Sequence, residues 1–140
     1  MGGNMGFRRL LTGALIGFIS CEAVAEWKYV DVSDGIFAFV DTDTISNVSE
    51  YGREQNRKFW SKQFVAEDLV QDGLAVGDYR MVLSWVNCQE RTIGVKSVTA
   101  YKKQKNGSYK HDTETLPYVS MQEIIPGSIG DKVADLVCSY

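Results

Sequence analysis

The chain has 140 residues, and its 15 lysines and arginines against 18 aspartates and glutamates give a net charge of −3. An acidic balance favours solubility and argues against a nucleic-acid partner. Its one histidine and three cysteines form neither a four-ligand zinc pattern nor a Cys-x-x-Cys redox motif, which excludes those two classes of site.

The N-terminus carries the three parts of a secretory signal. Arg8 and Arg9 precede the apolar run 10–19, and the Ala-Val-Ala of residues 23–25 stands directly before Glu26. As a helix this run would span roughly 15 Å, about half of a bilayer's hydrocarbon core, so it does not make an ordinary transmembrane anchor. We predict a cleavable signal peptide over residues 1–25 and an exported protein.

Cys21 allows a different processing of the same leader. The cysteine follows Phe18-Ile19-Ser20, and the group resembles a bacterial lipoprotein site, at which the cysteine is lipidated and becomes the first mature residue. Cleavage after Ala25 and lipidation at Cys21 both stay open. A lipid anchor is the only contact with a membrane that we expect.

Residues 26–140 read as one domain, without linker, repeat or low-complexity segment. The leader contains two of the basic residues and one of the acidic residues, so the remaining 13 basic and 17 acidic residues give a net charge near −4. A chain of this length buries roughly 65% of its unfolded surface and folds alone. We predict no cofactor.

Two cysteines remain in the domain once Cys21 is assigned to the leader. In an oxidising compartment Cys88 and Cys138 form a single pair, and we expect them to be disulfide-bonded. Closing a loop of this length contributes about 4 kcal/mol of stability in the chain-entropy model.

Short runs rich in aromatic and β-branched residues, separated by glycine, aspartate and asparagine, predict antiparallel strands. We expect strands over residues 27–32, 36–41, 59–65, 79–88, 91–102 and 108–112. The first two form a hairpin around Ser33-Asp34-Gly35, and Asn106-Gly107 marks the turn before the last. Residues 66–78 are expected to form a loop with one helical turn at 67–70.

The C-terminus changes to a helical period. Ser128 is placed to cap a helix, and its apolar face consists of Ile129, Val133, Leu136 and Val137. The predicted fold is therefore α+β, an antiparallel sheet of about five to six strands with a C-terminal helix packed on it. Cys138 on the helix would then reach Cys88 in the sheet.

The residues for catalysis are scarce. No Gly-x-Ser-x-Gly elbow or unpaired mature cysteine is present, and the one histidine, His111, stands in a very polar stretch typical of an exposed loop. Asp41-Thr42-Asp43 is only the first fragment of a calcium loop. Carboxylates for a glycosidase are available at Asp41, Asp43, Glu67, Asp68 and Asp78. We predict a non-enzymatic protein and hold a hydrolase as the remote alternative.

A basic, aromatic-flanked tip stands out from this acidic background. It surrounds the Asn106-Gly107 turn and consists of Tyr101, Lys102, Lys103, Lys105, Tyr109 and Lys110. Such a tip suits an anionic glycan or an acidic protein surface. The alternative is that the lysines only discourage edge-to-edge aggregation of the sheet.

An ordered set of short motifs spans nearly the whole domain. It consists of Trp27-Lys28-Tyr29, the Phe-Val-Asp-Thr-Asp-Thr-Ile of residues 39–45, Cys88 with Arg91, Ile125-Pro126-Gly127-Ser128 and Val137-Cys138. In this order the motifs resemble the surface-adhesin protein E family, and residues 26–140 are identified as an adhesin E-like domain.

The resemblance implies an antiparallel sheet, a C-terminal helix and a disulfide joining them. It also implies a protein of the Gram-negative periplasm, outer membrane or cell surface that adheres to host matrix or cell-surface components. The partner would be a protein or an anionic glycan. The alternative is a periplasmic accessory or inhibitor protein that binds an envelope protein or a glycan, because a fold does not fix a function.

Overall fold

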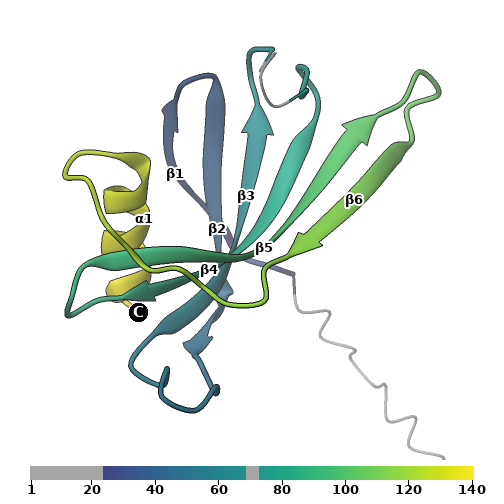
Figure 1. Cartoon of the computed structure of the whole chain (residues 1–140). Helices are drawn as coiled ribbons and strands as arrows, with labels where there is room; N and C mark the ends of the chain where they lie inside the picture. The colour runs from purple at the N-terminus through teal and green to yellow at the C-terminus, as the bar shows by residue number, and fades with distance from the viewer. Residues whose placement is uncertain (1–23, 69–72) are drawn as a thin grey trace, which may run out of the picture.

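The computed structural model describes residues 24–68 and 73–140, which form one antiparallel sheet with a single helix against one face (Figure 1). The elements are β1 (Trp27–Ser33), β2 (Ile36–Asn47), β3 (Arg57–Val65), β4 (Tyr79–Asn87), β5 (Thr92–Lys103), β6 (Tyr109–Thr115), β7 (Gln122–Glu123) and α1 (Ile129–Cys138).

The first six strands lie in chain order, each antiparallel to the next. Strand β7, which the sequence did not predict, pairs with the start of β5, whereas β6 pairs with its C-terminal half. The predicted α+β fold is confirmed, and several strands extend beyond their predicted ends, β2 by six residues to Asn47.

The tight turns follow from local chemistry. Asp34 and Gly35 both have positive φ, 50° and 73°, as the two-residue turn that matches the twist of a hairpin requires. Between β4 and β5, the Oδ1 of Asn87 accepts the amides of Gln89 (3.0 Å) and Glu90 (2.9 Å). Arg91 has a φ of 55°, so β5 begins one residue later than predicted.

The main core lies between α1 and the sheet. Its fully packed members are Val40, Phe59, Val86, Val133, Ala134 and Val137. The Oγ of Ser128 accepts the amide of Asp131 at 3.2 Å, which confirms the predicted N-cap. The helical period therefore places one apolar face of α1 on the sheet, as expected.

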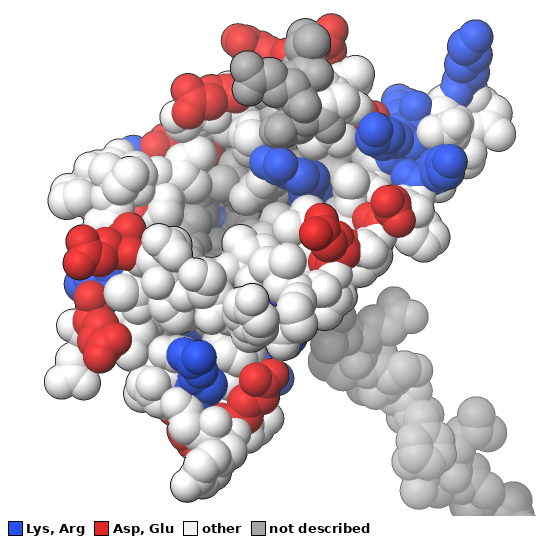
Figure 2. Space-filling model, viewed as in Figure 1, with Lys and Arg blue, Asp and Glu red and all other residues white. Residues whose placement is uncertain are grey.

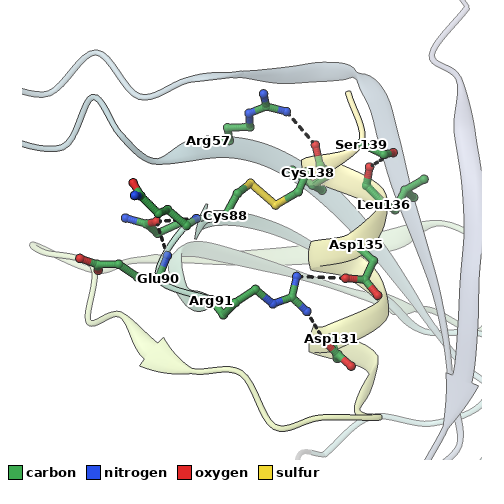
Figure 3. Close-up of a disulfide and its surroundings, with 12 residues drawn as sticks. Arg57, Cys88, Glu90, Arg91, Asp131, Asp135, Leu136, Cys138 and Ser139 are labelled. Atoms are coloured by element: carbon green, nitrogen blue, oxygen red, sulfur yellow. Dashed lines mark hydrogen bonds and ion pairs between the residues drawn. A yellow bond between two sulfur atoms is a disulfide. The ribbon is translucent and has the colours of Figure 1, made fainter.

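Covalent and polar contacts fix the end of α1 (Figure 3). Cys88 and Cys138 are disulfide-bonded, which confirms the predicted pair. The guanidinium of Arg57 donates to the carbonyl of Val137 at 3.1 Å. A second guanidinium, that of Arg91, forms ion pairs with two aspartates of the helix.

A smaller cluster lies on the opposite face of the sheet, where Trp85 packs with Val48, Val119 and Met121. A Cβ added to Gly94 would stand 2.5 Å from Val119 Cγ1. Glycine at this position therefore allows the segment 119–121 to cross β5 closely. The cluster covers one end of this face. The predicted helical turn at 67–70 lies partly outside the described residues, and Glu67 is in a bend.

Candidate binding surface

The β5–β6 hairpin carries all six residues that the sequence predicts as ligand contacts. In the register, Lys102 pairs with Lys110 and Lys103 pairs with Tyr109. Directly paired residues of antiparallel strands point to the same face, so the first pair lies on the side of α1 and the second pair on the other side. Lys105 lies in the turn between them. The structure thus places these side chains at one tip but on two faces.

The predicted turn at the tip is confirmed. Gly107 has a φ of 83°, which a residue with a side chain rarely adopts. The Oδ1 of Asn106 accepts both the amide (3.0 Å) and the hydroxyl (2.6 Å) of Ser108. The side chain of Asn106 therefore shapes the turn and leaves the lysines free to face solvent.

The loop before β4 braces the base of the hairpin. The backbone amide of Lys103 donates to Asp78 Oδ1 at 2.8 Å, and the amide of Ala75 donates to the other carboxylate oxygen at 2.9 Å. The hydroxyl of Tyr109 donates to the carbonyl of Gly77 at 3.1 Å. These bonds hold the hairpin at a defined angle to the sheet.

Aromatic rings join the hairpin to the centre of the sheet. Tyr101 stacks on Tyr79 with ring centroids 4.5 Å apart and planes 9° apart, and Tyr109 meets the same ring edge-on at 5.2 Å. Burial raises the pKa of Tyr79, and the two neighbouring tyrosines raise it further. The phenol of Tyr79 therefore stays protonated at physiological pH.

The four lysines of the hairpin are all exposed, and Figure 2 shows a group of lysine or arginine side chains on the projecting tip. Within residues 24–68 and 73–140, none of the four forms an ion pair with a carboxylate. A cluster of cations without an ion-pair partner among the described residues attracts anionic partners, even on a domain of net negative charge, over a Debye length of roughly 8 Å at physiological salt.

A hollow of about 650 Å³ lies beside the hairpin on the side of α1. Two of the hairpin lysines, Lys102 and Lys110, line it together with Arg80. The remaining lining residues are Leu74, Ala100, His111 and Asp112. Three cations against one carboxylate extend the basic character of the hairpin into this hollow.

The acids and the histidine that the sequence offers for catalysis either accept backbone hydrogen bonds or are exposed. Asp41 accepts the amide of Asp43 at 3.2 Å inside β2, and Asp68 accepts the amide of Val76 at 3.0 Å. His111 is exposed on β6 with its ring beside Tyr101. In the part of the chain that the structure describes, no three His, Cys, Asp or Glu side chains are grouped to hold a metal.

The sequence reasoning missed an aromatic row on the face of the sheet away from α1. The aromatic row consists of Tyr29, Phe37, Phe39, Phe64, Tyr79, Tyr101 and Tyr109. A signal for it was present, because a single helix covers only one face of a sheet and the strands carry aromatic residues for both. The row reaches from β1 to β6.

Cys21 and most of the predicted leader lie outside the described residues. Among the helices that the structure does describe, none has the length and apolar character to cross a bilayer.

The fold and this surface define a class of small disulfide-linked domain in which one helix covers one face of an antiparallel sheet. The profile of the family described as surface-adhesin protein E matches residues 27–139, and the chain belongs to that family. Membership indicates a surface adhesin, and hence an exported protein that binds host components.

One solved structure supports the fold. Crystal form II of Haemophilus influenzae protein E has a TM-score of 0.51 with this chain at 12% sequence identity, and the match covers 84% of this chain and 97% of that one. No curated protein sequence matches. At this identity the likeness concerns the fold alone.

Proposed function

We propose that this protein is a non-enzymatic adhesin of the Gram-negative cell envelope that binds an anionic host matrix or cell-surface component through the β5–β6 hairpin. Residues 1–25 direct its export, and Cys21 is the site of a lipid anchor if processing occurs there. The observation that carries the proposal is the group of four exposed lysines without an ion-pair partner among the described residues.

Protection of a sheet edge accounts for only part of this group. Edge lysines discourage aggregation when they stand on the outermost strand, and of the four only Lys110 lies on β6. Lys102 and Lys103 belong to β5, an interior strand, and Lys105 lies in the turn. A contact surface explains all four positions.

The shape of the hairpin also suits binding. It projects beyond the rest of the sheet (Figure 1), so a partner reaches it without meeting α1. Its base is fixed by the bonds to Asp78 and Gly77, which lowers the entropy lost on binding. A rigid cationic projection is suited to a sulfated or carboxylated glycan and to an acidic protein surface.

The test is binding of the purified domain to immobilised heparin and to immobilised polyglutamate, with dextran as the uncharged surface. The variant is Lys105→Glu with Lys110→Glu. The matched control is Arg53→Glu with Lys58→Glu. It makes the same charge change away from the hairpin, in the loop before β3 and at the second residue of that strand. Both are first checked for an unchanged unfolding temperature.

We expect the hairpin variant to weaken binding to at least one anionic surface by about tenfold or more, and the control by less than about threefold. Binding should also fall steeply with salt. Equal losses in the two variants would show a general charge effect and would contradict the proposal. Absence of binding to either anion would favour a periplasmic accessory role.

A further inference from the structure

The aromatic row forms a continuous line of ring contacts across six strands. Its centroid distances run from 6.5 Å between Tyr29 and Phe37 to 4.5 Å between Tyr79 and Tyr101. The intermediate contacts lie between 5.2 and 5.8 Å. With neighbouring strands about 4.8 Å apart, the row is roughly 24 Å long.

These rings are not part of the main core, which lies under α1 on the other face. Tyr29 is 53% exposed, Phe37 40%, Phe64 37% and Tyr109 41%. On soluble proteins, contiguous exposed apolar patches mark interaction surfaces or ligand-binding grooves. Tyrosine and phenylalanine are also enriched where proteins meet.

A cation stands over the middle of the row. The Nζ of Lys62 lies 4.5 Å from the ring centroid of Tyr79 and 4.7 Å from that of Phe64, as in a cation–π contact. No carboxylate of residues 24–68 or 73–140 forms an ion pair with it. Lys103 extends the positive charge on the same face toward the hairpin.

A shallow hollow of about 230 Å³ lies beside the row. It is lined by Asp41, Trp60, Met81, Thr99 and Tyr101. The carboxylate of Asp41 accepts a backbone amide, and the hydroxyls of Thr99 and Thr113 bond to each other. The hollow therefore offers space for one side chain beside polar groups that are already hydrogen-bonded, and Lys62 lies next to it because it pairs with Met81 in the register.

We infer that this face holds an extended acidic segment of a partner protein, with an apolar side chain in the hollow and a carboxylate on Lys62. The inference rests on the proposed function and extends its contact surface from the hairpin along the aromatic row. An extended peptide rises about 3.3 Å per residue, so about seven residues span the row.

Three other occupants fit the observations less well. A second copy of the chain would bring another Lys62 against the first if the two rows crossed at their centres. An anionic bilayer is held by clusters of about four or more lysines and arginines, whereas the row itself carries Lys62 and Lys103 on this face. A sugar ring would stack on a free aromatic face, but Tyr79 and Tyr101 use their faces on each other.

The test uses an eight-residue peptide in which glutamate and leucine alternate at the odd positions and serine fills the even ones, so that one face of the extended chain carries both. Two further peptides replace the glutamates by lysine or the leucines by serine. Binding to the mature domain is followed by amide chemical shifts and by a titrated dissociation constant. Heparin and phosphatidylglycerol vesicles are titrated in parallel.

The protein variants are Lys62→Gln and Phe64→Ala, with Lys58→Gln as the control on the same strand and face. We expect the glutamate-leucine peptide to shift amides of the residues in the aromatic row, most strongly at Phe64 and Tyr79 beside Lys62, and to bind more tightly than either altered peptide. Lys62→Gln should weaken it about fivefold and Phe64→Ala about tenfold or more, with Lys58→Gln unchanged.

Equal binding of all three peptides, or of the Lys62→Gln and Lys58→Gln proteins, overturns the inference. If only the hairpin variant loses peptide binding and the Lys62 and Phe64 variants keep it, the inference about the row is overturned, while the proposed function stands. Heparin or vesicle binding that depends on Lys62 without peptide binding assigns the row to a glycan or a membrane instead. If peptide binding depends on Lys62 and heparin binding is lost only in the hairpin variant, the aromatic row and the hairpin are two separate binding surfaces.

Discussion

The disulfide offers the prediction with the clearest magnitude. Cys88 and Cys138 are 50 residues apart in sequence, and closing a loop of that length stabilises the folded state by about 4 kcal/mol. The ion pairs of Arg91 with α1 involve a guanidinium that is 41% exposed, and such pairs contribute at most about 1 kcal/mol. The bond should therefore dominate the attachment of the helix end.

The perturbation is Cys88→Ala together with Cys138→Ala, measured by urea unfolding with tryptophan fluorescence. With a slope near 1.5 kcal/mol/M, the midpoint should fall by about 2 to 3 M. The wild-type domain kept reduced should match the variant. Because Val133, Ala134 and Val137 stay buried against the sheet, the variant should still fold, with faster amide exchange in the last turn of α1. A loss below about 1 kcal/mol would refute the reasoning.

Three further outcomes follow from particular contacts. Gly94→Ala should destabilise the domain by about 1 to 3 kcal/mol in urea unfolding, because its Cβ would stand 2.5 Å from Val119; an unchanged midpoint would contradict that close approach. Lys132 donates a hydrogen bond to Asp31 and lowers the pKa of that carboxyl, so this pair stabilises the fold above the ordinary aspartate pKa and is lost as pH falls through the lowered one. The stability of Asp31→Asn should accordingly fall less steeply than that of the wild type below about pH 4, and identical profiles would exclude the contribution. Intact mass spectrometry of the protein from its own host should find a chain that begins either after the predicted leader or at an acylated Cys21, and an unprocessed chain would refute the signal peptide.

Much of the fold could be predicted from local pattern. Two hairpin turns carry residues that favour their backbone, Asp34-Gly35 and Asn106-Gly107, and Ser128 marks the start of the helix because its hydroxyl caps a free amide. The pairing of Cys88 with Cys138 was predictable because no other cysteine remained in the domain. The turn and cap signals act over a few residues, and the cysteine pairing has one solution, so a single sequence is enough to predict these features.

The features that escaped prediction depend on contacts between distant segments. Strand β7 has two residues and exists only because it meets the start of β5. The register shift between Tyr29 and Asp31 places both Val30 and Asp31 on the face of α1, where Val30 packs against the main core and Asp31 accepts a hydrogen bond from Lys132 of the helix. No residue type predicts this shift. The aromatic row was overlooked because its members come from six strands, so the line appears only once the register is known.

The central claim is that the basic hairpin is displayed outside the cell. Its most direct test is labelling of intact cells of the native host with a membrane-impermeant amine reagent, followed by peptide mapping of Lys105 and Lys110. The account predicts that both lysines are labelled before the outer membrane is opened. Labelling only after permeabilisation would place the protein in the periplasm and contradict the adhesin function.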